Sequence, residues 1–273
     1  RIRTQIKKPV PLKELSAYCA NIRNEVILFK KNEKIAKHAT PGFLDSFLDS
    51  LEQTILHSKQ LTEKIQNLKS ISRKLIHEMD FKLLYDSHRK LFSIGLRVSE
   101  NQLDLSYYDL LASEARLTSF IAIAKGDVPV THWFHLGRSL VQAGSEVALV
   151  SWSGSMFEYL TPCVVMHSPE GSLLADTCRR AIHSQIQYGE EKNVPWGLSE
   201  SAYNKRDLQL TYQYSNFGVP ELGLKRGLGN DLVVAPYASL LATLFEPVAA
   251  AQNLHRLQSM GLLGAYGFYE AVD

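Results

Sequence analysis

The segment Ser-Trp-Ser-Gly-Ser-Met-Phe-Glu-Tyr-Leu at residues 151–160 is the most informative part of the sequence. A second segment of similar character, Val-Pro-Trp-Gly-Leu-Ser-Glu-Ser-Ala-Tyr-Asn, follows at 194–204. Each combines a Trp, a Gly, several Ser and a Glu. A core excludes carboxylates unless they are paired, and a solvated face does not gather Trp. The combination is typical of a pocket for a polyhydroxylated ligand, where Trp forms a flat wall and carboxylates bind hydroxyls or transfer protons.

Composition divides the chain into two regions. The 273 residues are 45% hydrophobic and 21% charged, as in an ordinary soluble globular protein. The net charge of +2 gives no argument for a nucleic-acid partner, and none is expected. Residues 1–79 carry 15 Lys and Arg against 8 Asp and Glu, whereas residues 80–273 carry 15 against 20. We therefore expect a helical linker or arm over 1–79 and a separate domain over 80–273.

Several features argue against a metal, a disulfide framework or a membrane span. Cys19, Cys163 and Cys178 are scattered and odd in number, which fits a reducing compartment and no disulfide framework. His132 and His135 have a suitable spacing on a helix, but no carboxylate pattern completes a metal site. No apolar run approaches the ~18 residues of a membrane span. We expect neither a metal nor a cofactor.

The periodicity of residues 12–79 predicts three amphipathic helices. The first covers Leu12 to about Lys37, Pro41-Gly42 interrupts the pattern, a second begins at Phe43, and a third runs from Thr62 to about Met79. A structural role as scaffold or interdomain arm is favoured over docking through the Lys-rich faces.

The domain is predicted to be mainly α. Helices are expected over 107–124, 156–166 (weakened by Pro162), 173–188, 236–244 and 247–260, and a loop leading into a short helix over 194–204. Strands are expected over 91–98, 147–150 and 207–217, with a turn at 99–102. The helix over 107–124 is apolar nearly all round, with Ser106 and Gly126 as its caps.

Glu114 lies within that predicted buried helix, so its carboxylate must be paired, protonated or facing a cavity. The residues alone leave two interpretations equally open: a functional carboxylate, or a structural one paired with an Arg from elsewhere. Asp109 is explained as well by the helix dipole as by function. Trp133 is equally compatible with a core position and with a sugar platform.

Five segments, residues 106–116, 151–160, 194–204, 217–228 and 266–271, resemble the glucoamylase-like central domain of cyclic β-1,2-glucan synthases. The resemblance runs in order over about 78–273. It implies an (α/α)6 toroid, of which this chain would supply the N-terminal portion. It also implies a glycosyltransferase domain and a phosphorylase-like domain in the same polypeptide, and an inner-membrane protein with this domain in the cytoplasm.

The resemblance further implies a retaining transglycosylation that closes linear β-1,2-glucan into a ring. Retention uses two carboxyl groups about 5–5.5 Å apart. The matching positions are Glu114 as nucleophile and Glu200 as acid/base. The residues expected at the substrate are Asp109, Arg116, Trp133, Trp152, Glu158, Trp196, Tyr203 and Asn204. Two alternatives are an inverting β-glucanase, with carboxyls about 6.5–9.5 Å apart, and a non-catalytic glucan-binding module.

Overall fold

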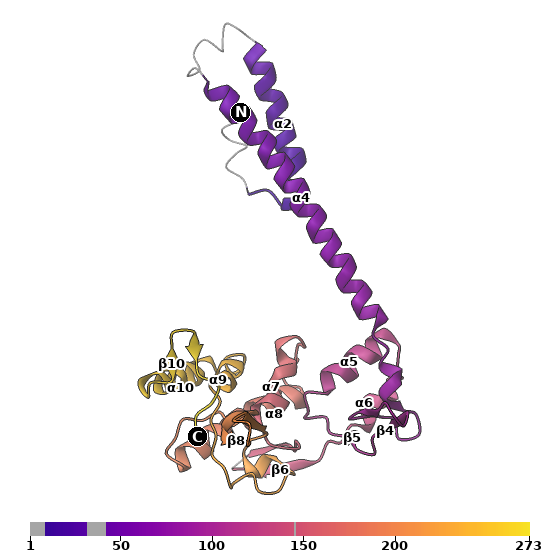
Figure 1. Ribbon diagram of the computed structural model, residues 1–273, viewed down its shortest axis with the longest axis vertical. Helices are drawn as coiled ribbons and strands as arrows, with labels where there is room; N and C mark the ends of the chain where they lie inside the picture. Colours follow the sequence, from indigo (N-terminus) through magenta and orange to yellow (C-terminus); the bar gives the residue numbers. More distant parts are fainter. Residues whose placement is uncertain (1–8, 32–41, 145) are drawn as a thin grey trace. The chain divides into compact units, whose positions relative to one another are not determined.

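The computed structural model describes residues 9–31, 42–144 and 146–273. The chain forms two compact units, residues 1–79 and 80–273 (Figure 1). Helices account for most of the regular structure, so the chain is mainly α, as predicted. The strands that accompany them are short and antiparallel.

The first unit is a helical hairpin of α2 (Leu12–Lys31) and α4 (Phe43–Glu78). The two helices lie side by side around a small apolar core that Cys19, Ile22, Val26 and Leu51 form (Figure 1). Two separate helices were predicted after Phe43, and this was wrong, because α4 is continuous. No Gly or Pro lies between residues 43 and 78, so nothing in the sequence ends the helix there. Residues 32–37 of the first predicted helix, Pro41 and the basic segment 1–8 lie outside the described residues.

The second unit begins with the short helix η1 (Phe81–Leu84) and a three-stranded sheet. Its strands are β1 (Tyr85–Asp86), β2 (Leu91–Ser93) and β5 (Tyr107–Tyr108). A hairpin of β3 (Leu96–Arg97) and β4 (Gln102–Leu103) surrounds the predicted turn. The single strand predicted over 91–98 is thus divided at residues 94–95, because the chain leaves one sheet and enters the other.

The long helix predicted from Tyr107 is wrong in its first half. Residues 107–108 pair with β2 instead, Phe92 opposite Tyr108, and helix α5 begins only at Arg116 and ends at Lys125. The aromatic pair satisfies its backbone groups in a sheet, which a helical periodicity cannot reveal. The predicted cap at the other end is confirmed, since Gly126 has a φ of 77° and caps α5.

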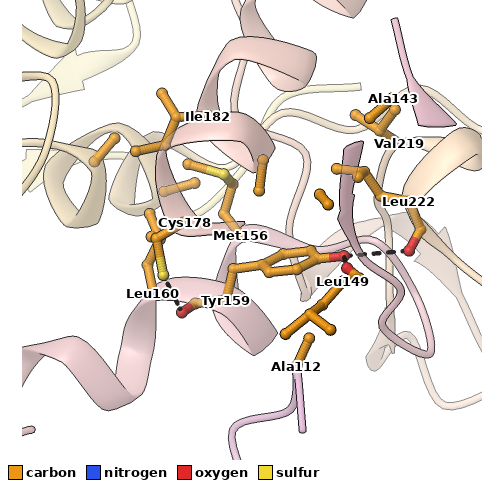
Figure 2. Packing of buried hydrophobic residues seen from close by; sticks show 14 of the residues in the cluster. Ala112, Ala143, Leu149, Met156, Tyr159, Leu160, Cys178, Ile182, Val219 and Leu222 are labelled. Atoms are coloured by element: carbon orange, nitrogen blue, oxygen red, sulfur yellow. Dashed lines mark hydrogen bonds between the residues drawn. The ribbon is translucent and has the colours of Figure 1, made fainter. Parts of the chain in front are cut away.

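A buried core then joins the hairpin β6–β7 (Leu140–Ala143, Glu146–Leu149) to three helical segments. Helix α7 covers Met156–Leu160, η2 covers Thr161–Val164 and α8 covers Leu173–Glu191. The predicted effect of Pro162 is confirmed, because α7 gives way to a 3-10 helix there. At the centre of the core the hydroxyl of Tyr159 donates to the carbonyl oxygens of Leu149 and Leu222 (Figure 2).

The C-terminal part contains the hairpin β8–β9 (Ser201–Arg206, Tyr212–Ser215) and helices α9 (Pro236–Ala242) and α10 (Pro247–Ser259). The short helix η3 (Pro220–Leu222) and strands β10 (Leu263–Gly264) and β11 (Gly267–Phe268) complete it. The predicted passage from a loop to a helix over 194–204 is wrong, because residues 201–204 belong to β8. The helices at 236 and 247 are confirmed, and both begin with Pro at a first-turn position.

Of the described helices in this unit, α5, α8 and α10 have ten or more residues, whereas α6 (Thr131–His135), α7 and α9 are shorter. The toroid therefore stays a prediction. In the described part of the chain, no helix is both long enough and apolar enough to cross a membrane.

Candidate active site

Glu114 occupies a turn immediately before α5, not the middle of a buried helix as predicted. Its carboxylate is half-buried and accepts a hydrogen bond of 3.1 Å from the Ser113 hydroxyl. It lines a cavity of about 290 Å³ together with Tyr108, Phe92 and Thr118. Burial is the largest cause that raises the pKa of Glu114, and the negative charges of Glu158 and Glu200 raise it further. Glu114 is therefore a carboxyl group with access to a cavity and an elevated proton affinity.

Glu200 lies one residue before β8 and is held by the β8–β9 hairpin. Its carboxylate accepts hydrogen bonds from Asn216 Nδ2 at 2.8 Å and from the Tyr214 hydroxyl at 3.3 Å. Its main-chain carbonyl accepts a 2.8 Å hydrogen bond from the hydroxyl of Tyr237 on α9. Both the side chain and the backbone of Glu200 are thus fixed by polar contacts.

Glu114 and Glu200 interact electrostatically although 86 residues separate them in sequence. The hydroxyl of Tyr108 is affected by both glutamates. Burial is the main cause that raises its pKa, and the charges of Glu114 and Glu200 raise it further. Charges interact appreciably only over short distances in a protein. Tyr108 thus lines the cavity with Glu114 and is affected by the charges of both glutamates, whereas Glu200 is not among the residues that line this cavity.

Glu158 is different, because it is buried, with 4% of its surface exposed. Its two oxygens accept hydrogen bonds from the hydroxyls of Ser151, Ser153 and Ser155 and from the backbone N–H groups of residues 152, 153 and 155, at 2.6–3.2 Å. Ser155 and Glu158 also form a capping box at the start of α7. The serines of the 151–155 loop thus surround a buried carboxylate instead of leaving room for a ligand. The same loop presents Trp152, which is 59% exposed.

Arg116 and Trp196, both expected at the substrate, lie in the interior. Arg116 is 2% exposed and donates to the main-chain carbonyls of Ser113, Glu158 and Tyr159 at 2.5–3.0 Å. Trp196 is 6% exposed, and its backbone N–H donates to the side chain of Asn253. Arg116 is thus held within the protein by main-chain carbonyls, whereas Trp196, although largely buried, lines a cavity of about 200 Å³ together with Asn253.

Comparison with known proteins identifies the family of this chain. Residues 106–273 match the family Glycoamylase, described as "Putative glucoamylase", and this range includes both Glu114 and Glu200. The chain belongs to the glycoamylase family. It is also 54% identical over 213 residues to the cyclic β-(1,2)-glucan synthase NdvB of Rhizobium meliloti (strain 1021). That match covers 78% of this chain and 8% of the relative. The resemblance to the glucoamylase-like domain of such synthases is thus confirmed.

In this glycoamylase domain the remaining predicted substrate residues lie at or near the surface. Asp109 is exposed, and its main-chain carbonyl accepts a hydrogen bond from the N–H of Gly137. Trp133 is half-buried and packs against the main core. Tyr203 and Asn204 line a second cavity of about 350 Å³ at the β8–β9 hairpin, together with Tyr212, Tyr269, Glu270 and Asp273.

Sequence reasoning missed the residues that contact Glu200 or share the Glu114 cavity, which are Tyr108, Tyr214, Asn216 and Tyr237. Tyr108 was assigned to a helix, and the other three carry no motif of their own. Of the two histidines considered for a metal, His132 has a structural position. It is fully buried between the Lys90 carbonyl and the Ser119 hydroxyl, and burial lowers its pKa. Among the described residues, no group of His, Cys, Asp and Glu could hold a metal ion.

Proposed function

We propose that this chain is the ring-closing part of a cyclic β-1,2-glucan synthase and that Glu114 and Glu200 are its catalytic pair. The observation that carries the proposal is the 54% identity to a synthase named for this product. The position of Glu114 at a cavity, where the charge of Glu200 still raises its pKa, supports it independently. The chain spans 8% of that relative's length, so the activity of the whole protein is part of the proposal.

The proposed reaction proceeds in two steps with retention of configuration. A carboxylate attacks the anomeric carbon of a linear glucan, while the second carboxyl group donates a proton to the departing glycosidic oxygen. A hydroxyl at the far end of the same chain then attacks the glucosyl-enzyme ester, and the second group takes up its proton. The bond broken and the bond formed are equivalent, so the reaction needs no cofactor.

The division of roles is a separate question. The family resemblance gives Glu114 as nucleophile and Glu200 as acid/base. The raised pKa of Glu114 and the two donors to Glu200 favour the opposite order, because an acid must be protonated and a nucleophile ionised. Azide rescue of Glu114→Ala and Glu200→Ala separates them: the acid/base variant gives a β-glucosyl azide, whereas the nucleophile variant gives the α-anomer.

Trp152 is our main proposed sugar platform, because its side chain is exposed while its loop is fixed. Tyr203, Asn204, Asp109 and Trp133 are further candidates for substrate contact. Glu158 acts through the loop that it holds and not by direct contact. We also propose an (α/α)6 toroid, neighbouring glycosyltransferase and phosphorylase-like domains, and a cytoplasmic position in an inner-membrane protein, as the resemblance implies.

The test is ring formation by the full-length polypeptide from linear β-1,2-glucan, with products identified by a mass one water below the linear chain. We expect rings from the wild type and none from Glu114→Gln or Glu200→Gln. Glu170→Gln is the matched control, because its side chain is 90% exposed, and it should form rings normally. Rings from both site variants would remove these residues from the mechanism.

Two other functions give different outcomes in the same assay. An inverting glucanase would shorten the linear chains without forming rings. A non-catalytic binding module would bind glucan and leave it unchanged, and Glu114→Gln would behave as the wild type.

A further inference from the structure

Cys163 and Cys178 are in contact although they come from different elements. Their sulfur atoms lie 3.7 Å apart, Cys163 in η2 and Cys178 in α8, and both are free thiols. Cys178 is buried, whereas Cys163 is half-buried and thus accessible to a small oxidant. A disulfide has sulfurs about 2.05 Å apart, so the pair would have to close by roughly 1.7 Å.

The surroundings of the two thiols distinguish them chemically. Contact with the Cys178 sulfur is the largest cause that lowers the pKa of Cys163, and contact with Ser168 and the charge of Arg116 lower it further. The same contact between the sulfurs, together with burial, raises the pKa of Cys178. This is the arrangement of a reactive thiolate beside a protonated resolving thiol.

Arg116 connects this pair to Glu114. The guanidinium Nη2 lies 3.6 Å from the sulfur of Cys163 and donates to the carbonyl oxygen of Tyr159. The Cys178 thiol donates to the same oxygen (Figure 2). Arg116 also donates to the carbonyl of Ser113, whose hydroxyl contacts the Glu114 carboxylate. A chain of direct contacts therefore runs from the sulfurs to the turn before α5.

We propose that Cys163 and Cys178 are a redox-sensitive dithiol, which hydrogen peroxide closes to a disulfide, and that closure disturbs the turn that carries Glu114. The second half of this inference rests on the function proposed above; the first half does not.

The chemistry balances with peroxide as oxidant. The thiolate of Cys163 attacks one peroxide oxygen, the O–O bond breaks, and the departing hydroxide takes up a proton to form water. The sulfur of Cys178 then attacks the sulfenic acid of Cys163, and the S–O bond breaks. Hydroxide leaves and becomes a second water with the thiol proton. The two sulfurs lose two electrons, which peroxide gains. A dithiol reductant reverses the step by exchange.

Closure removes interactions on which Arg116 depends. When the disulfide forms, the Cys163 sulfur, which lies 3.6 Å from the guanidinium Nη2, must move toward Cys178, and the S–H donor to the carbonyl of Tyr159 is lost. A buried cation that loses a polar contact is destabilised. We expect the 113–116 turn to shift and ring formation to fall by roughly 2- to 30-fold, the range in which packed networks couple two sites.

Peptide mapping of the full-length polypeptide tests the first half. Trypsin leaves both cysteines on one peptide, residues 139–179, and a second protease that cuts after Glu170 separates them. After peroxide treatment and alkylation, we expect 159–170 and 171–179 to stay joined without reductant and to separate with it. Cys19 is the internal control and should remain alkylated. Two alkylated cysteines, or Cys163 oxidised to a sulfinic acid without linkage, would overturn the dithiol.

Ring formation by the same samples tests the second half. The activity should fall on oxidation and return with dithiothreitol, whereas Cys163→Ser, which lacks the reacting thiol, should have the same activity with and without peroxide at the concentration that links the wild type. Linked peptides with unchanged activity would overturn the coupling to Glu114. Linked peptides from a wild type that forms no rings even when reduced would overturn the proposed function and leave the dithiol intact.

Discussion

Two regions of the second unit combine serine with glutamate and use the carboxylate in opposite ways. Next to the 151–155 loop, Glu158 of α7 is buried and accepts hydrogen bonds from three hydroxyls and three backbone N–H groups of that loop. In the 113–116 turn, Glu114 is half-buried, faces a cavity and accepts one side-chain hydrogen bond, from Ser113. A carboxylate with every lone pair occupied is structural, whereas one that is desolvated and only partly satisfied retains the capacity to react.

The largest effect expected from this comparison is a slower rate of ring formation by the Glu114→Gln variant. The amide has nearly the same shape but can neither attack a sugar nor transfer a proton, so ring formation should fall by roughly 10²- to 10⁴-fold. Resistance to denaturant should hardly change, because few contacts are lost. The measurement is initial rates of ring formation beside urea unfolding, which the fluorescence of the three Trp residues reports. A large loss of stability would place Glu114 in the same class as Glu158.

The next effect is on the stability of Glu158→Ala. Removal of this carboxylate leaves several buried donors without an acceptor, so the free energy of unfolding should fall by roughly 3–5 kcal/mol. The same urea unfolding measures it, with Glu170→Ala as the exposed control. A loss below about 1 kcal/mol, the net value of a single ordinary hydrogen bond, would contradict the structural role.

A smaller effect is expected from Trp152→Ala, which probes what the Glu158-centred loop presents. The indole is exposed, so its loss should leave stability unchanged within roughly 0.5 kcal/mol. Loss of an aromatic platform should weaken glucan binding by roughly two- to tenfold. We expect this as a raised KM with little change in kcat. An unaltered KM would remove Trp152 from the substrate surface, and Leu173→Ala, another exposed apolar truncation, controls for general effects.

The sequence predicted best those features that depend on neighbours along the chain. The stripe of α8, the Pro162 interruption and the Gly126 cap all depend on residues a few positions apart, and all are confirmed. It failed where a distant partner decides the outcome. Residues 107–108 joined a sheet with β2, and Trp196 is held by Asn253, which lies 57 residues away. The Glu158 site could not be predicted for a related reason, since its donors converge only when the loop has folded.

For the candidate site, the sequence pattern and the resemblance predicted the two glutamates, and the structure shows which residues contact them. A motif can identify a candidate catalytic residue, because that position is matched directly. It does not show whether Arg116 turns inward to three carbonyl oxygens or outward to a substrate. Burial separates these cases, and it placed three of the eight expected substrate residues, Arg116, Glu158 and Trp196, inside the protein.

The smallest expected effect concerns the pH dependence of stability, and it tests whether the Glu114 carboxyl group is desolvated. The folded pKa of Glu114 is raised above its ordinary value of 4.5, mainly by burial. The folded state thus binds this proton more tightly than the unfolded state. Below pH 4.5 the group is protonated in both states and costs nothing; as pH rises through the folded pKa, it destabilises the protein.

Glu114→Gln removes the carboxyl group and with it this pH-dependent destabilisation. The variant should therefore gain stability relative to the wild type as pH rises from 4 to 7. The gain should be modest, because the carboxyl group is only half-buried and solvent screens it. The measurement is the difference in urea midpoint between the two proteins across that range, with Glu170→Gln as the control that should show no trend. A difference that shrinks as pH rises would mean that folding lowers the pKa of Glu114, which would contradict a desolvated carboxyl group at this position.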